Sequence, residues 1–159
     1  MIHPELLLLI MLANGVPLLV YNLLGPRIAV PVDFGLRLPD GEPLFGPSKT
    51  WRGLLTAVTV SAAVAASLNL TWQVGATVAL WALFGDLLSS FIKRRLKMAH
   101  GTRALGLDQV PESLLPLWAV ADRFALDGES ILAMVVTFFV LELLLSRVLF
   151  RLNLRKHPH

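Results

Sequence analysis

Asp86 is a carboxylate near the end of an apolar run, residues 75–92, and a basic cluster at 93–95 follows it directly. An ionisable side chain in a membrane-spanning stretch costs several kcal/mol unless it faces a cavity or a partner, so Asp86 is a candidate functional residue.

One face of a helix here would carry Asp86, Ser89, Ser90, Lys93 and Lys97, with Arg94 at its edge and Arg95 opposite. A carboxylate beside hydroxyl and basic groups can hold a divalent cation and phosphate oxygens. The alternative for 93–95 is that they only mark the cytoplasmic end of the helix.

A second polar segment, Gly-Pro-Ser-Lys-Thr-Trp-Arg-Gly at 46–53, follows a Gly/Pro-rich stretch and opens a predicted helix. The N-terminus of a helix points free N–H groups at anions, and here Lys49, Thr50 and Arg52 would join them in binding phosphates. The segment is not a P-loop, because the residues before Lys49 lack the required glycine frame. In the alternative interpretation, Thr50 caps the helix and Arg52 extends its guanidinium to the membrane surface.

The third polar segment is Gly-Leu-Asp-Gln at 106–109. Its Asp108 is a second candidate metal carboxylate, and it is also placed to be the N-cap of a following helix with Pro111 in the first turn. Capping and metal ligation are compatible. Glu112, one turn further on, is either a helper carboxylate or an ordinary first-turn acid.

The composition indicates a membrane protein with a single domain, residues 1–159. The chain is 55% hydrophobic and 16% charged, and its apolar residues come in blocks of membrane-helix length. There is no cysteine, so disulfides are excluded. No two of the four histidines have the spacing at which a helix presents two ligands to one metal ion, so a zinc site is not indicated. We attribute the net charge of +3 to membrane orientation and headgroup attraction, not to nucleic acid binding.

We expect an all-α integral membrane fold with five transmembrane helices, at 5–24, 54–70, 72–92, 111–124 and 131–150. With the N-terminus outside and the C-terminus in the cytoplasm, thirteen of the fourteen Lys and Arg residues lie inside and only Arg123 lies outside. Asp122 and Asp127 then belong to an outer turn. The Pro/Gly-rich stretch 25–48 is predicted to be a cytoplasmic or re-entrant segment without helix.

Two features of this topology stay open. The fourth span is short and contains Pro111 and Pro116, so either it starts in an aqueous pocket below the membrane surface or its helix continues to Asp127. Glu142, inside the last span, either pairs within the helix bundle or reaches the polar site.

The three polar segments resemble the CDP-archaeol synthase family, small five-helix relatives of the phosphatidate cytidylyltransferases. The resemblance is carried by Lys49-Thr50-Trp51-Arg52-Gly53, by Gly85-Asp86-Leu87 with Ser90-Phe91 and Lys93-Arg94, and by Gly106-Leu107-Asp108-Gln109. The larger enzymes have a second acid three residues after the loop aspartate, where this chain has Pro111. Either Glu112 substitutes for that acid or the site works with fewer carboxylates.

The resemblance implies a nucleotidyltransferase of the cell membrane that makes a CDP-lipid and pyrophosphate from CTP and a membrane lipid phosphate. The active site would face the cytoplasm and use Mg²⁺. Asp86 and Asp108 would be catalytic metal carboxylates, with Glu112 as a third candidate. Four basic residues would hold the triphosphate and the lipid phosphate: Lys49, Arg52, Lys93 and Arg94. Ser90 would be a polar neighbour of the metal. A homodimer is a candidate assembly.

Alternative functions remain at this point. The family name implies an archaeal ether lipid, di-geranylgeranylglyceryl phosphate, but no residue distinguishes ether from ester linkages, so phosphatidate giving CDP-diacylglycerol is an alternative. A CDP-alcohol phosphotransferase would need a dense Asp-x-x-Asp-Gly run, which this chain lacks. A non-enzymatic transporter or scaffold would spread its polar groups through the membrane depth, whereas these groups gather near one face.

Overall fold

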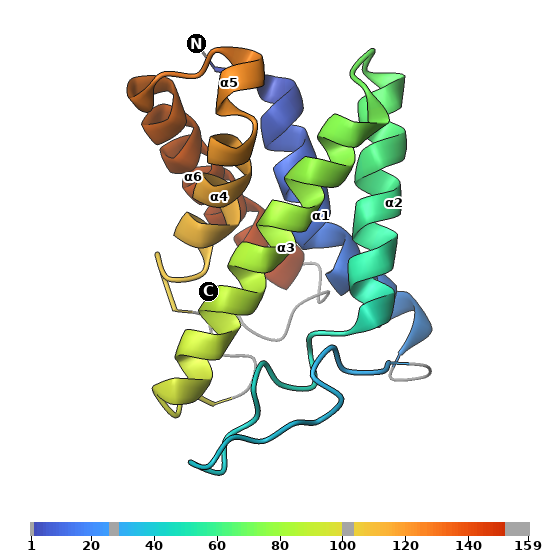
Figure 1. The fold of residues 1–159 in the computed structure, drawn as a ribbon, viewed down its shortest axis with the longest axis vertical. Coiled ribbons are helices and arrows are strands. Elements are labelled where there is room, and N and C mark those ends of the chain that lie inside the picture. The colour runs from blue at the N-terminus through green and yellow to red at the C-terminus, as the bar shows by residue number, and fades with distance from the viewer. Residues whose placement is uncertain (1, 26–28, 100–103, 152–159) are drawn as a thin grey trace.

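The computed structural model describes residues 2–25, 29–99 and 104–151, with side chains up to 147. Over these residues the fold is all-α, as the sequence predicts (Figure 1). The helices are α1 (Pro4–Leu24), α2 (Trp51–Ser67), α3 (Trp72–Arg95), α4 (Gln109–Ala119), α5 (Ala121–Phe124) and α6 (Gly128–Arg151). The long helices alternate in direction, so the end of α3 lies at the same end of the bundle as the starts of α2 and α4.

Helix α2 begins at Trp51, three residues before the predicted start at Leu54. Thr50 explains this early start, because it is extended (φ −120°, ψ 145°) and its side chain accepts a hydrogen bond from the N–H of Gly53. The helix-capping interpretation of Thr50 is therefore confirmed.

Helix α3 continues to Arg95, past the predicted end at Ile92. Lys97 lies beyond this end, is exposed and has a positive φ of 54°. The prediction that Lys97 shares the helical face of Asp86 is therefore wrong, because the helix has ended before Lys97.

The predicted fourth helix is divided into two pieces. Helix α4 spans only 11 residues, and Val120 (φ −111°, ψ 7°) separates it from the short α5. The chain thus reaches Asp122 through a separate turn, so the predicted continuous helix over 111–124 is wrong. Figure 1 shows α5 beside the start of α1, at the opposite end of the bundle from the start of α2.

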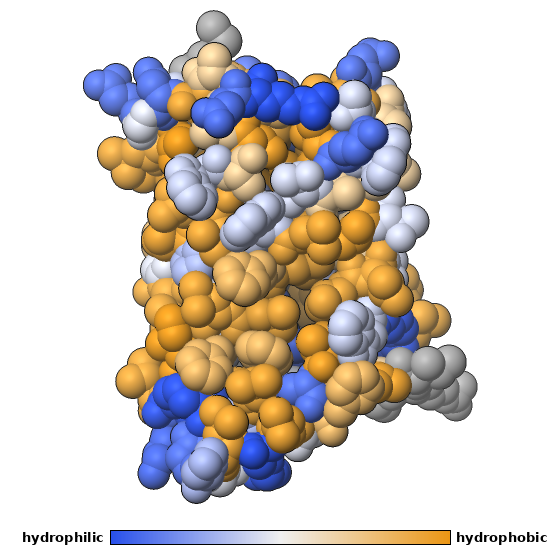
Figure 2. All heavy atoms as spheres, viewed as in Figure 1, coloured by the Kyte–Doolittle hydropathy of each residue, from blue (hydrophilic) through white to orange (hydrophobic). Residues whose placement is uncertain are grey.

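Within the described residues, three helices are long and apolar enough to cross a membrane: Pro4–Leu24, Trp72–Arg95 and the Gly128–Arg147 part of α6. Helix α2 is apolar but has 17 residues, and α4 has 11. Figure 2 shows a largely apolar surface across the middle of the face in view, with hydrophilic side chains gathered at its two ends. This pattern suits a membrane protein, while the five-span count and the orientation stay predictions.

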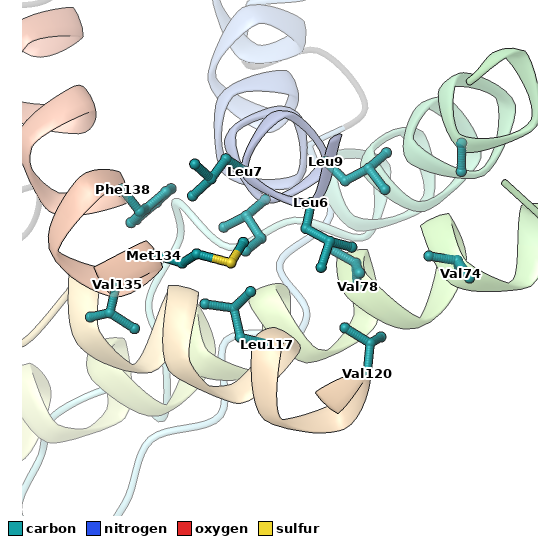
Figure 3. Close-up of a cluster of buried hydrophobic side chains, with 12 residues drawn as sticks. Leu6, Leu7, Leu9, Val74, Val78, Leu117, Val120, Met134, Val135 and Phe138 are labelled. Carbon is teal, nitrogen blue, oxygen red and sulfur yellow. The ribbon is translucent and has the colours of Figure 1, made fainter. Parts of the chain in front are cut away.

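The main apolar core lies where α1, α3, α4 and α6 meet (Figure 3). Leu6, Val78, Leu117, Met134 and Phe138 are at most 1% exposed and pack in one cluster from these four helices. In lipid such packing cannot rely on expelling water, so close van der Waals contact has to hold the helices together.

The α2–α3 crossing relies on small residues instead. A Cβ added to Gly75 would lie 2.2 Å from the carbonyl oxygen of Ser61 and 2.7 Å from the Cβ of Ala65. Only glycine at position 75 permits this backbone approach, as small residues do at membrane helix interfaces.

The α1–α2 loop, residues 29–50, contains no helix, as predicted. Two isolated antiparallel bridges fold it back on itself, one between Pro31 and Thr50 and the other between Arg37 and Pro43. Figure 1 shows the loop across the end of the bundle, beyond the start of α2 and beside the end of α3. Its position delivers Lys49 to α3.

Candidate functional site

Two ion pairs bring together the three polar segments that the sequence singles out. Lys49 Nζ lies 2.5 Å from Oδ1 and 2.6 Å from Oδ2 of Asp86. Lys93 Nζ lies 2.8 Å from Oδ1 of Asp108. The α1–α2 loop, the end of α3 and the loop before α4 thus meet in one charged cluster at one end of the bundle.

Lys49 and Asp86 are both partly accessible, with 21% and 22% of their side chains exposed. Burial lowers the pKa of Lys49, but the carboxylate of Asp86, helped by those of Glu112 and Asp108, outweighs burial and raises it. Lys49 therefore stays a cation at neutral pH. The site thus holds a positive charge beside the Asp86 carboxylate, and a cation of this kind can bind a polyanionic substrate.

Asp108 is at the N-cap position of α4 but does not cap the helix. Its backbone is already helical (φ −80°, ψ −55°), and its side chain makes no hydrogen bond with the first turn. Instead, Oδ2 accepts a hydrogen bond from the N–H of Ala104 at 3.2 Å, while Oδ1 faces Lys93. The capping interpretation of Asp108 is therefore wrong.

The side chain of Gln109 helps to shape the same loop. Gln109 is fully buried, and its Oε1 accepts a hydrogen bond from the N–H of Gly106 at 2.8 Å. Together with the Ala104–Asp108 bond, this contact orders the loop before α4 and orients the Asp108 carboxylate toward α3.

Glu112 lies next to Asp86 because α3 and α4 cross without a side chain between them at Gly85. A Cβ at Gly85 would lie 2.4 Å from the carbonyl oxygen of Pro111 and 2.8 Å from the backbone nitrogen of Glu112. Glu112 is 6% exposed and interacts electrostatically with Asp86, Lys49 and Glu142. The crossing thus adds a third carboxylate to the cluster and brings Glu142 of α6 into its electrostatic range.

The other predicted site residues lie around this cluster. Arg94 and Ser90 are buried on α3, at 4% and 3% exposure. The Nη2 of Arg94 donates a hydrogen bond to the carbonyl of Ala99 at 3.1 Å. Arg52 donates from Nη2 to the carbonyl of Gly25 at 2.9 Å. The Thr50 hydroxyl serves as the α2 cap. Phosphate binding by these four residues stays a prediction.

Three charged residues, Asp33, Asp40 and Arg95, make contacts in or with the α1–α2 loop that were not predicted from the sequence. Asp33 is 8% exposed and accepts hydrogen bonds from backbone N–H groups within the α1–α2 loop. Arg95 pairs with Asp40 of the same loop. The Asp33-Phe34-Gly35 and Asp40-Gly41 sequences are typical of aspartate-initiated turns, so local turn chemistry was the available signal.

The carboxylates have the chemistry of a magnesium site, although the described residues contain no group of three or more acidic or histidine side chains arranged to hold a metal. Mg²⁺ commonly uses one or two protein carboxylates together with water and substrate phosphates. The two oxygens of Asp86 already accommodate a cationic group, the Lys49 ammonium, between them. The chemistry of Asp86 is therefore compatible with the predicted magnesium ion, and a role of Asp108 as a second ligand stays a prediction.

Acidic residues at the other end of the bundle take no part in this cluster. Asp122 and Arg123 belong to α5, where Arg123 Nη2 donates to Thr71 Oγ1 at 3.1 Å. Asp127 accepts a hydrogen bond from the N–H of Ser130 at 2.8 Å at the start of α6. Their separation from the Asp86 cluster agrees with the prediction (Figure 1).

Comparisons with known proteins show which family this chain is similar to. The sequence model of the CarS-like CDP-archaeol synthase family matches residues 6–159. The chain is 38% identical to CDP-archaeol synthase of Sulfurisphaera tokodaii, covering 89% of this chain and 90% of the relative. It is 42% identical to CDP-archaeol synthase of Pyrococcus furiosus, covering 67% and 71% respectively.

A solved structure, described as an intramembrane enzyme for archaeal membrane lipids biosynthesis, has the same fold. It superposes with a TM-score of 0.73 at 30% identity and covers 89% of this chain and 90% of its own. Together with the apolar helices, this likeness supports a multi-pass membrane protein.

Proposed function

This chain belongs to the CDP-archaeol synthase family, and on that premise we propose that it transfers the cytidylyl group of CTP to a lipid phosphate. The products would be a CDP-lipid of the CDP-archaeol type and pyrophosphate. The proposal places the active site at the Asp86–Lys49 and Asp108–Lys93 pairs, on the cytoplasmic side of the membrane.

The observation that carries this proposal is the pairing of two aspartates with two lysines across three separate chain segments. Charged side chains near the membrane interior are costly unless they are paired or face a cavity, and groups of this kind commonly mark a substrate site. A nucleoside triphosphate needs both kinds of group, because its phosphates require cations and its metal requires carboxylates.

In the proposed reaction an oxygen of the lipid phosphate attacks the α-phosphorus of CTP. The new bond joins that oxygen to the α-phosphorus, the bond from the α-phosphorus to the α–β bridging oxygen breaks, and pyrophosphate leaves. The lipid phosphate is anionic and already nucleophilic, so no serine or histidine base is required. Catalysis then depends on bringing two polyanions together in line.

The basic residues of the site perform this task in our proposal. Lys49 and Lys93 hold phosphate oxygens, and each is already oriented by a carboxylate at less than 3 Å. Arg94 and Arg52 would add further positive charge for the phosphates. Asp86 and Asp108 would hold Mg²⁺, which when bound neutralises charge on the phosphates.

The residues of the site do not distinguish one lipid phosphate from another by their chemistry, but the relatives favour one choice. Those relatives are CDP-archaeol synthases, so we propose an archaeal ether lipid phosphate, 2,3-di-O-geranylgeranylglyceryl phosphate, over phosphatidate. A transporter or scaffold is disfavoured because the two ion pairs gather at one end of the bundle and are not spread through the membrane depth.

The test is a reconstitution assay with the purified chain in lipid nanodiscs. CTP and Mg²⁺ are supplied with the ether lipid phosphate or with phosphatidate, and both pyrophosphate and CDP-lipid are measured. We expect product with the ether lipid, loss of at least about 100-fold in Asp86→Asn, and normal rates in Asp122→Asn, which removes a distant carboxylate. Failure of both lipids to give product would refute the proposed reaction, and a preference for phosphatidate would refute the lipid assignment.

A further inference from the structure

The α1–α2 loop is folded around a single buried carboxylate, Asp33. Asp33 accepts hydrogen bonds from the backbone N–H groups of Gly35 at 3.0 Å, Phe45 at 2.9 Å and Gly46 at 3.0 Å. Burial raises the pKa of Asp33, but these amide hydrogen bonds outweigh it and lower the pKa below its ordinary value. The carboxylate thus stays ionised and holds both arms of the loop together.

The backbone of Lys49 is bonded to both arms of this loop. Its N–H donates to the carbonyl of Gly46 at 3.2 Å, and its carbonyl accepts from the N–H of Val32 at 2.8 Å. Gly46 is itself bonded to Asp33, and Val32 is the residue before Asp33. The position of Lys49 therefore depends on how the whole loop is folded and placed.

Arg95 is the contact that places the loop on α3. Its Nη1 pairs with Oδ2 of Asp40, and its Nη2 donates to the carbonyls of Pro43 at 2.7 Å and Glu42 at 3.4 Å. The guanidinium also lies over the ring of Phe91, 5.3 Å from its centroid. An exposed ion pair alone contributes little to stability, but here one planar group makes several directed contacts with one loop tip.

The loop thus touches α3 at two charged points, Lys49 on Asp86 and Asp40 on Arg95. Asp86 and Arg95 are nine positions apart, which is about 13 Å along a helix. Between these points lie Ser90, Lys93 and Arg94, the other predicted site residues of α3. The loop therefore lies along the functional part of the helix.

We propose that Arg95 and Asp40 form a positioning pair that fixes the α1–α2 loop and thereby holds Lys49 over Asp86. This inference rests on the proposed function only in the role that it gives Lys49. Arg95 and Asp40 would touch neither substrate, and they act through Lys49. Because a lysine side chain is long and flexible, a loop that is released from α3 would leave its ammonium poorly placed for phosphates.

The kinetic test uses Asp40→Ala, Arg95→Ala and Arg95→Lys, with Glu42→Gln as the matched control at the same loop tip. We expect kcat/KM for CTP to fall about 10- to 100-fold in the three variants, with most of the loss in KM, and to stay normal in Glu42→Gln. Arg95→Lys should not rescue activity, since it keeps the charge but loses the planar group. Full activity in Arg95→Ala would overturn the proposal.

A double-mutant cycle separates positioning from general stability. If the pair acts through Lys49, Asp40→Ala should have almost no further effect on kcat/KM in a Lys49→Ala background. Additive losses would show that Asp40 acts independently of Lys49, and they would overturn the positioning role.

A spectroscopic test does not depend on turnover. The chain has no cysteine, so spin labels at Ser48→Cys and Leu96→Cys, both exposed positions, report the distance between the loop and α3. We expect a narrow distance distribution that broadens in Arg95→Ala but not in Glu42→Gln. An unchanged distribution would overturn the positioning role, whereas absence of nucleotide transfer by the unaltered chain would overturn the proposed function instead.

Discussion

Lys49 sits almost symmetrically on Asp86, with its Nζ 2.5 Å from one carboxylate oxygen and 2.6 Å from the other. The two residues are 37 positions apart and come from a loop and a helix, so the ion pair depends on the tertiary fold. An ammonium between both oxygens takes the place in which a carboxylate would bind a divalent cation. Lys49 therefore has to share Asp86 with any metal that enters the site.

We expect Lys49→Met to lower kcat/KM for CTP by about 100-fold, because it removes a charge aimed at the phosphates while keeping a side chain of similar length. Steady-state assays of pyrophosphate release would measure this loss. Lys97→Met is the matched control, since Lys97 lies past the end of α3 and is exposed. Equal activity of the two variants would contradict the role of Lys49.

A second prediction concerns the α3–α4 crossing. Gly85→Ala would place a methyl group 2.4 Å from the carbonyl oxygen of Pro111, so the helices must separate and move Asp86 away from Glu112. We expect a loss of about 1–3 kcal/mol in the free energy of unfolding together with loss of activity. Thermal unfolding in detergent and the turnover assay would measure the two effects.

Two further glycines serve as controls for Gly85. Gly15→Ala meets nothing within 4 Å and should be tolerated, while Gly75→Ala clashes with Ser61 at the α2–α3 crossing, away from the charged site. If Gly85→Ala and Gly75→Ala lose activity only in proportion to stability, the special role of the α3–α4 crossing is refuted.

Much of the site could be predicted from the sequence because its residues are out of place for a membrane segment. Asp86 follows an apolar run, and Asp108 and Lys49 lie beside helix ends. Such residues are visible without knowledge of the fold, since a charge near the membrane interior needs a partner. Their pairing partners were not visible, because Lys49–Asp86 and Lys93–Asp108 depend on how loops cross the end of the bundle.

The errors in prediction have local causes. The break at Val120 was missed because its neighbours Ala119 and Ala121 are both good helix formers, and tertiary packing decides where the helix ends. The role of Arg95 was missed because helical periodicity places it opposite Asp86, while its partner Asp40 comes from a loop of unknown course. Periodicity describes one helix and carries no information about such a partner.

A third prediction follows from the lowered pKa of Asp33. A carboxylate whose folded-state pKa lies below its ordinary value of 3.8 stabilises the fold fully above that value and loses its effect as the pH falls through the folded-state pKa. Asp33→Asn should therefore weaken the α1–α2 loop by about 1–3 kcal/mol at neutral pH. Hydrogen exchange of the Phe45 and Gly46 amides, which bind Asp33, would measure the change.

The pH profile separates this effect from ordinary loop packing. The difference in exchange between the unaltered chain and Asp33→Asn should be constant near neutral pH and should shrink as the pH drops below about 4. A difference that persists in strong acid would show that the charge of Asp33 is not what holds the loop.

The last prediction concerns Glu112 as a helper carboxylate for the metal. Chelation of divalent cations should abolish turnover, and Glu112→Gln should raise the Mg²⁺ concentration for half-maximal rate by about tenfold, as loss of a supporting ligand does. The physical reason is that the carboxyl group of Glu112 is buried beside Asp86 and Lys49, where it could supply an oxygen to a metal held by Asp86. Glu129→Gln, at an exposed position in the first turn of α6, is the control.

Binding of Mn²⁺, followed by electron paramagnetic resonance in the presence of CTP, gives a readout independent of turnover. We expect weaker Mn²⁺ binding in Glu112→Gln, and no change in Glu129→Gln. If Glu112→Gln keeps both its Mg²⁺ dependence and its Mn²⁺ affinity, then Glu112 is a packing residue of the α3–α4 crossing, and Asp86 and Asp108 remain as the two protein carboxylates for the metal.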